Sequence, residues 1–285
     1  MKKLTLPFVE TMITQVCNLS CTGCTNYSDL VHRGYVPWQE GKQQILQWLE
    51  RINIEEFGIM GGEPMINPEW QSWLAGVRML LPDARLRFTT NGLLLHKYPD
   101  IVDLLEDIGN VTFKITIHVN DDQLNNCIDE IFSARSWTPV TEFGINRWQG
   151  PSGLRFQINR PEIFTKTYQN SYHDMKPWHS QPSAAFDNCC QQTCPLLYNG
   201  RIYKCSTAGL LKSTLERFSW PNQQEWQQYI DDGIGVNDAD ADVQQFVDNF
   251  GLPARICGQC PTAADTISQL SHVINVRRKN DKTML

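Results

Sequence analysis

A chain of 285 residues is long enough to bury a substantial core in one large domain or two. Its hydrophobic content of 41% is ordinary, and the absence of an apolar run of about 18 residues excludes a membrane-spanning helix. Residues 1–7 lack the apolar stretch of a secretory signal, so the ten cysteines predict a cytoplasmic setting in which thiols serve metals more often than disulfides. The net charge of −6, with no Lys/Arg cluster among aromatics, gives no electrostatic sign of nucleic-acid binding.

Strand and helix patterns alternate over residues 6–160. Ile45, Trp48, Leu49 and Ile52, for example, have the i, i+3, i+4, i+7 spacing of one helix face. We expect strands at 8–13, 56–60, 86–90, 111–119 and 154–158, and helices at 38–53, 67–77, 101–108 and 121–132. Repeated strand–helix units predict a parallel sheet with right-handed crossovers, which fits both a partial barrel and an open doubly wound sheet.

Three cysteines follow the first strand with the spacing CxxxCxxC: Cys17, Cys21 and Cys24. Three thiolates in one short loop suit one side of an iron–sulfur cube and leave its fourth iron open. A structural zinc site would need a fourth ligand, for which His32 is the nearby candidate. A disulfide framework is typical of short secreted chains, which this chain does not resemble.

Other candidate functional residues follow the next strands. Gly61-Gly62-Glu63-Pro64 follows the second strand, Thr90-Asn91-Gly92 the third, and His118-Val119-Asn120 the fourth. Ligands gather at the carboxyl ends of parallel strands, so these loops and the cysteine loop predict one site at that edge.

The strand–helix alternation stops near residue 161, and the remaining sequence divides into smaller parts. We expect a core at 1–160, a linker or lid at 161–188, a cysteine-rich unit at 189–262, and an amphipathic helix with a charged tail at 263–285. Aromatic and histidine side chains near the lid either cover a substrate or only pack: Trp148, Tyr172, His173, Trp178 and His179.

A hairpin with an Asn199-Gly200 turn is expected over residues 194–205. Counting outward from the turn places Cys194 opposite Cys205, about 4.5–5.5 Å apart at their Cβ atoms. Cys257 and Cys260 form a CxxC pair, and these four thiols would complete a second site. An iron–sulfur cluster, a zinc ion and a disulfide remain its alternatives, while Cys127 is expected to be a buried apolar residue.

These motifs resemble the radical S-adenosylmethionine (SAM) superfamily over residues 6–160. Cys17, Cys21 and Cys24 match its cluster motif, and residues 61–64 match its GGEP motif, although Gly23 stands where the family often has an aromatic residue. The resemblance implies an α/β fold with a partial (β/α)6 TIM-like barrel. It also implies a [4Fe–4S] cluster whose open iron binds SAM, and an external electron donor such as flavodoxin or ferredoxin. Reductive cleavage would then give a 5′-deoxyadenosyl radical that abstracts a substrate hydrogen.

The resemblance also implies which residues contact SAM. Glycine at positions 61 and 62 would let the backbone approach the methionine amino group without a Cβ clash. Thr90, Thr116 and His118 lie at strand ends where the family contacts ribose or carboxylate, although threonine is also common in ordinary strands. The expected cofactor-binding residues are Gly61, Gly62, Glu63, Pro64, Thr90, Thr116 and His118.

The C-terminal cysteines are similar to the Twitch and SPASM extensions of the same superfamily, which implies one auxiliary [4Fe–4S] cluster. That pattern usually places the first ligand nine or more residues before the glycine, which would choose Cys189 or Cys190. The hairpin geometry instead favours Cys194. We therefore expect the auxiliary ligands to be Cys194, Cys205, Cys257 and Cys260.

The expected function is a radical enzyme that oxidises or rearranges a small polar, sugar- or cyclitol-like metabolite, with the auxiliary cluster handling electrons. Modification of a peptide or protein side chain is a second enzymatic hypothesis. A non-catalytic iron–sulfur carrier or sensor is the third, but a carrier has no need of the residue 61–64 loop. The sequence assigns no catalytic residue.

Overall fold

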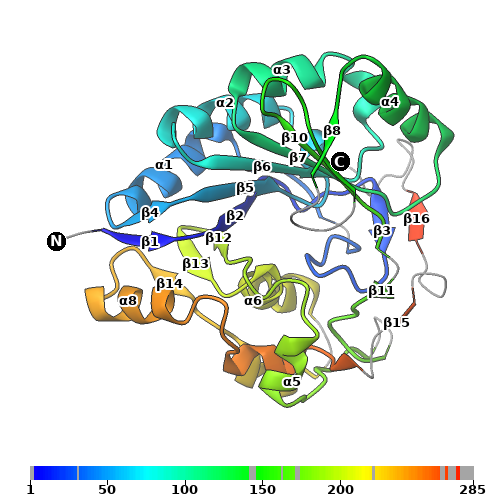
Figure 1. Ribbon diagram of the computed structural model, residues 1–285. Helices are drawn as coiled ribbons and strands as arrows, with labels where there is room; N and C mark the ends of the chain where they lie inside the picture. Colours follow the sequence, from blue (N-terminus) through cyan, green and yellow to red (C-terminus); the bar gives the residue numbers. More distant parts are fainter. Residues whose placement is uncertain are drawn as a thin grey trace.

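A ten-stranded mixed sheet organises the chain (Figure 1). The computed structural model describes residues 3–30, 32–140, 146–161, 163–170, 174–219, 222–263, 267–268 and 274–276. In spatial order the strands are β14 (Ile234–Gly235), β13 (Arg201–Tyr203), β12 (Leu196–Tyr198), β2 (Val9–Met12), β5 (Glu56–Met60), β6 (Arg85–Thr90), β7 (Val111–Thr116), β10 (Arg155–Asn159), β9 (Arg147–Gln149) and β8 (Thr138–Pro139).

The middle of this sheet is parallel, from β12 through β2, β5, β6 and β7 to β10. Antiparallel strands extend it at both ends. The predicted α/β class with a parallel sheet is confirmed. Among the described residues β14 and β8 end the sheet and do not pair with each other, so closure into a barrel is not seen.

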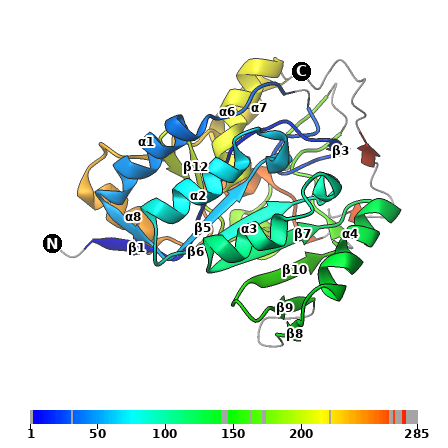
Figure 2. The ribbon, with the colours of Figure 1, turned by 90° about the horizontal axis from the view of Figure 1, so that it is seen from above.

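Four helices cover one face of the sheet (Figures 1 and 2). They are α1 (Trp38–Leu49), α2 (Trp70–Leu80), α3 (Ile101–Ile108) and α4 (Asp122–Ser133), as their periodicity predicted. Val111, Phe113 and Ile115 of β7 are fully buried in the same core as these helices. Because strand side chains alternate, Lys114 and Thr116 point to the opposite face, where the functional site lies.

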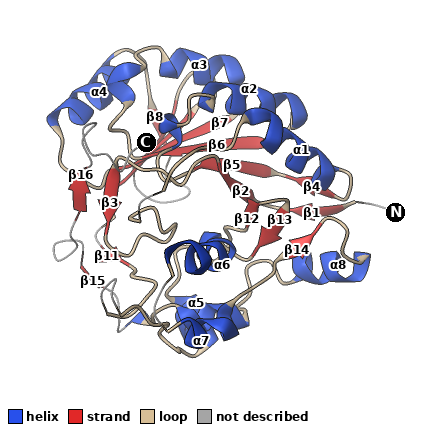
Figure 3. Cartoon of the chain, turned by 180° about the vertical axis from the view of Figure 1, so that it is seen from behind, coloured by secondary structure: helices blue, strands red, loops and turns tan. Residues whose placement is uncertain are grey.

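Smaller elements lie on that opposite side (Figure 3). They are β3 (Leu19–Cys21), β11 (Ile163–Phe164), α5 (Pro182–Asp187), α6 (Ser206–Phe218), α7 (Gln223–Trp226) and α8 (Asp240–Asp248). Short 3-10 turns occur at η1 (Pro64–Ile66), η2 (Leu95–Lys97), η3 (Gln227–Tyr229) and η4 (Arg255–Gln259), and β1 (Leu4–Leu6) pairs with β4 (Ile52–Ile54). No helix in the described ranges is both long and apolar enough to cross a membrane.

The C-terminal segment differs from the amphipathic helix expected at 263–285. Its described parts are strands, β15 (Ile267–Ser268) and β16 (Ile274–Val276), so the helix prediction is wrong there. Strand β16 pairs antiparallel with β3, so that Ile274 lies opposite Cys21 and Val276 opposite Leu19. The β-branched side chains of Ile274 and Val276 favour a strand. A local helical pattern cannot reveal this distant partner. Leu270, Val273 and the basic residues 277–279 lie outside the described residues.

Candidate active site

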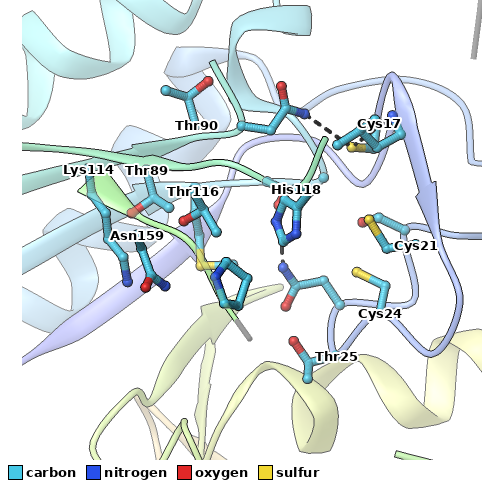
Figure 4. Close-up of a pocket in the computed structure, with 18 of the residues that line it drawn as sticks. Cys17, Cys21, Cys24, Thr25, Thr89, Thr90, Lys114, Thr116, His118 and Asn159 are labelled. Carbon is cyan, nitrogen blue, oxygen red and sulfur yellow. Dashed lines mark hydrogen bonds between the residues drawn. The ribbon is translucent and has the colours of Figure 1, made fainter. Parts of the chain in front are cut away.

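A cavity of about 350 Å³ lies at the carboxyl ends of the parallel strands and collects the residues predicted for the site (Figure 4). Its lining comes from the strands, from the cysteine loop after β2 and from the loop before β12. The lining includes Glu10, Cys17, Cys21, Cys24, Thr25, Gly61, Gly62, Arg87, Thr89, Thr90, Asn91, Lys114, Thr116, His118, Asn159, Cys190, Gln191 and Cys194.

The thiols of Cys17, Cys21 and Cys24 lie together at one end of this cavity (Figure 4). Successive turns shape their loop, because the Cys24 N–H donates to the Cys21 carbonyl at 3.0 Å and the Tyr27 N–H to the Cys24 carbonyl at 2.9 Å. Gly23 makes the turn possible with a φ of 72°. Its N–H donates to a carboxylate oxygen of Asp29 at 2.9 Å. A short loop thus holds three soft ligands along one wall.

This donor set fits an iron–sulfur cluster better than a single zinc ion. Within the described ranges, no three Cys, His, Asp or Glu side chains converge closely enough to hold one metal ion. In a [4Fe–4S] cluster each thiolate binds a different iron, so the thiols need not converge on one point. His32, the zinc alternative, has its Nε2 2.9 Å from the Tyr27 carbonyl and its ring against Phe218.

Gly61 and Gly62 allow the loop after β5 to lie directly against the chain leading into the cysteine loop. The Gly62 N–H donates to the Thr14 carbonyl at 2.8 Å. A Cβ at Gly62 would be only 2.5 Å from the Val16 carbonyl oxygen, and one at Gly61 only 2.7 Å from that of Thr14. The close approach of two backbones therefore requires glycine at both positions, and both glycines also line the cavity.

Glu63 is completely buried behind the cavity wall rather than on it. One carboxylate oxygen accepts hydrogen bonds from the Thr90 hydroxyl at 2.7 Å and the Met65 N–H at 3.1 Å, and the other accepts from the Asn91 N–H at 2.8 Å. Burial raises the pKa of Glu63 to about 7, while these three hydrogen bonds lower it. Glu63 thus positions the loop after β6, and neither it nor Pro64 lines the cavity.

The loop after β6 in turn contacts the cysteine loop. The Asn91 amide nitrogen donates to the Asn18 side-chain oxygen at 2.7 Å and lies 3.7 Å from the Cys17 sulfur. Thr90 lines the cavity, as do Thr116 and His118 further along the wall (Figure 4). The structure therefore brings all the predicted cavity residues together except Glu63 and Pro64.

Glu10 and Lys114 also line the cavity, although neither belongs to a motif that predicts the site. Burial raises the pKa of Glu10 to about 7, while nearby Arg87 and Lys114 lower it. Burial also lowers the pKa of Lys114. The sequence pattern that could have predicted them is a charged residue that alternates with apolar residues within a strand. Its side chain points to the same face as the polar residues near the end of that strand.

A second group of thiols lies in the C-terminal part. Burial raises the pKa of Cys260 well above its ordinary value, and Cys205, Cys189, Cys257 and, least, Cys190 raise it further. The pKa of Cys205 is likewise raised by burial and by Cys189 and Cys257. These mutual effects indicate that Cys189, Cys205, Cys257 and Cys260 are close neighbours.

Cys194 belongs to a different neighbourhood. The hairpin has the predicted register, with Leu197 opposite Ile202, but the pairing ends at Leu196 and Tyr203. Burial raises the pKa of Cys194 to about 12, and the groups that act on it are those of Glu10, Arg87, Lys114 and the neighbouring thiol of Cys190. The chain turns before the strand begins, so the ladder does not extend to Cys194 and Cys205, and Cys194 lines the cavity.

Polar contacts join the two cysteine sites. The Gln191 amide nitrogen donates to the Ser206 hydroxyl at 2.7 Å and to the Thr25 hydroxyl at 3.3 Å. The Thr207 hydroxyl donates to the Thr25 carbonyl at 3.0 Å. The loop that carries Cys24 is thereby connected to the start of α6, beside Cys205.

The aromatic residues near the expected lid pack elsewhere. Trp148 packs edge-on against Phe132, and the Trp178 indole N–H donates to the Lys166 carbonyl at 2.9 Å. A ring nitrogen of His179 lies 2.9 Å from the Tyr229 hydroxyl. None of these three side chains lines the cavity, and Tyr172 and His173 lie outside the described residues.

Comparison with known proteins agrees with the local geometry. Residues 11–141 match the model of the radical SAM superfamily, a range that includes both the cysteine loop and the residue 61–64 loop. Over these residues the chain is therefore similar to the radical SAM superfamily. No curated protein sequence matches the chain.

Solved structures extend the comparison to the fold. The crystal structure of BtrN in complex with AdoMet and 2-DOIA aligns over 92% of this chain and 95% of that chain, with a TM-score of 0.51 and 13% identity. Streptococcus suis SuiB bound to precursor peptide SuiA aligns over 42% of this chain with a TM-score of 0.34 and 22% identity. The chain spans 26% of that SuiB chain. The BtrN alignment supports a similar fold over nearly the whole chain.

The close approach at Gly62 predicts the effect of adding one methyl group. Gly62→Ala should destabilise the protein by about 1–3 kcal/mol, because the Cβ must displace the backbone beside the cysteine loop. Urea unfolding of the purified protein measures this. Gly150→Ala is the matched control, since its Cβ would meet only the Trp137 ring at 3.3 Å. An equal effect of the two substitutions would contradict the backbone contact.

The raised pKa of Glu63 predicts a pH dependence of stability. The folded protein retains this proton up to about pH 7, whereas the unfolded chain loses it near the ordinary value of 4.5. The stability of the wild type relative to Glu63→Gln should therefore be largest below pH 4.5 and fall by about 3 kcal/mol as the pH rises through 7. Urea unfolding across this range measures the difference, and a constant difference would exclude the raised pKa. The exposed Glu55→Gln serves as the control.

Proposed function

We propose that the chain is a radical SAM enzyme that abstracts a hydrogen atom from a small polar metabolite. The observation that carries the proposal is the convergence of Cys17, Cys21, Cys24, Gly61 and Gly62 on one cavity. A [4Fe–4S] cluster with bound SAM supplies, when reduced, the 5′-deoxyadenosyl radical. A pure electron carrier would need no such cavity beside its thiols.

The chain's own residues would bind and orient these groups. Cys17, Cys21 and Cys24 would hold the cluster, and the backbone at Gly61 and Gly62 would accept the methionine part of SAM at the cavity wall. Thr90, Thr116 and His118 would contact the remainder of the cofactor. The sheet and the surrounding loops would form a partial barrel that limits access of water, and a one-electron donor such as flavodoxin or ferredoxin would deliver the electron.

A small polar substrate is favoured by the far part of the cavity. Lys114, Thr89 and Asn159 lie together there, away from the cysteine triad (Figure 4). Such ammonium, hydroxyl and amide groups can hydrogen-bond to a hydroxyl-rich ring. BtrN, which is similar in fold, was crystallised with AdoMet and 2-DOIA. We infer a sugar- or cyclitol-like substrate, whose oxidation or rearrangement this site would initiate.

The second cysteine group would hold an auxiliary [4Fe–4S] cluster in the unit formed by residues 189–262. The mutual effects of the thiols on one another favour Cys189, Cys205, Cys257 and Cys260 as its ligands, with Cys194 left in the cavity. Four protein ligands leave no iron for substrate, so this cluster would accept or relay an electron. The contacts through Gln191 would hold it at a fixed position beside the first cluster.

Cofactor cleavage tests the enzymatic proposal. Anaerobically reconstituted protein, reduced in the presence of SAM, should form 5′-deoxyadenosine and methionine, and Cys24→Ala should reduce both to background because the triad loses a ligand. Liquid chromatography with mass spectrometry measures the products. Cys127→Ala is the control, since Cys127 lies on α4 and does not line the cavity. Absence of both products from the wild type would refute the proposal.

Iron analysis distinguishes Cys189 from Cys194 as the first auxiliary ligand. Reconstituted wild type should bind about eight irons per chain, and Cys189→Ala should bind about four because one [4Fe–4S] site loses a ligand. Cys194→Ala should retain about eight. The reverse pattern would restore Cys194 as the ligand, and zinc in place of the second set of irons would refute the auxiliary cluster.

A further inference from the structure

A buried carboxylate that forms no ion pair with any described residue faces the cavity from β2. Glu10 is only 8% exposed and lines the cavity together with Lys114 of β7. In the sheet, Glu10 lies opposite Gly58, where an added Cβ would be 2.8 Å from the Glu10 Cβ. Glycine at this position leaves the space that the Glu10 side chain fills, so the fold accommodates a charged group here.

Neither Glu10 nor Lys114 has a side-chain hydrogen bond or an ion pair within 4.0 Å among the described residues. Arg87, the third charged group nearby, is already engaged, because its guanidinium lies 2.5 Å from a Glu56 oxygen and 4.4 Å from the centre of the Phe8 ring. Burying a charge without a partner is costly, and proteins normally pair such groups. Glu10 and Lys114 thus face the cavity without reaching each other, and Arg87, which also lines it, is held by Glu56.

The chemistry of this gap selects a ligand with an ammonium group. A carboxylate removed from water is stabilised most by a cationic donor, and a ligand anion beside Lys114 would be repelled by Glu10. The Lys114 ammonium and the Asn159 amide can instead donate hydrogen bonds to neutral hydroxyl groups. A ring that carries one amine and several hydroxyls would satisfy both sides of the cavity.

We propose that Glu10 binds the protonated amine of the substrate, which is therefore an amino sugar or an aminocyclitol, while Lys114 and Asn159 bind its hydroxyl groups. This inference rests on the proposed function only in that it identifies the bound ligand as the substrate. The binding site itself rests on the cavity that Glu10 and Lys114 share and on their lack of an ion pair within the described ranges.

Binding of matched probes tests the inference. Isothermal titration calorimetry would use the anaerobically reconstituted full-length enzyme with SAM and without reductant. The probes are scyllo-inosamine against scyllo-inositol and D-glucosamine against D-glucose. Each amine should bind about ten- to hundredfold more tightly than its neutral partner, as expected for a hydrogen-bonded charge pair. Equal affinities, or no binding by either member of both pairs, would overturn the inference.

Variants identify the residue responsible. Glu10→Gln, of equal shape, should bind each amine no more tightly than its neutral partner, whereas Glu40→Gln on α1 should leave the preference unchanged. Iron content and circular dichroism establish that Glu10→Gln is folded. If it does not fold, Glu10→Asp, which retains the charge but withdraws it by one methylene, should weaken amine binding selectively. Retention of the full amine preference by the folded variant would overturn the inference.

An anionic probe separates this site from one centred on Lys114. D-glucuronate should bind more weakly than D-glucosamine, and tighter binding of D-glucuronate would overturn the inference. Because no reductant is present, the binding result does not depend on cofactor cleavage. Failure of SAM cleavage with an intact amine preference would refute the proposed function alone, and the opposite combination would refute only the amine site.

Discussion

The candidate active site depends on one buried carboxylate. Glu63 joins the loop after β5 to the loop after β6 through hydrogen bonds to Met65, Thr90 and Asn91. Asn91 then contacts Asn18 beside Cys17, while the adjacent glycines lie against the backbone that enters the cysteine loop. The start of the cysteine loop is thus held from two directions, by Asn91 and by the two glycines, and Glu63, which does not itself line the cavity, positions both. Glutamate suits this role because one side chain accepts all three hydrogen bonds across two loops.

Glu63 and Glu10 show how the same physical effect can serve two purposes. Burial raises the pKa of each to about 7. Glu63 is surrounded by donors, so its carboxylate completes a structural network. No donor in the described part of the chain reaches the Glu10 carboxylate, which faces the cavity and so remains available to a ligand. The number of hydrogen-bond partners, rather than the pKa, distinguishes the positioning residue from the proposed binding residue.

Features set by short-range patterns could be predicted from the sequence. Apolar periodicity identified α1 to α4 and the parallel strands between them, and the parallel order brought the residue 61–64 loop close to the cysteines. Long-range pairing was not predictable, as β16 shows by pairing with β3 from the far end of the chain. The conformation of the loop before β12 was not predictable either, because no periodic pattern specifies whether Cys189 or Cys194 approaches Cys205. Lys114 was accessible to prediction, since it alternates with buried residues of β7 and shares the face of Thr116.

Strand β2 connects the parts of the proposed chemistry. It carries Glu10, continues toward the cysteine loop, and pairs in parallel with β12, which follows the loop containing Cys189 and Cys194. The Glu10 N–H donates to the Pro195 carbonyl at 2.9 Å, so this pairing begins beside the proposed amine site. Electron transfer between the two proposed clusters and a substrate would require fixed separations. A shared sheet would provide them more rigidly than a flexible linker, because backbone hydrogen bonds in the parallel ladder resist relative displacement of its strands.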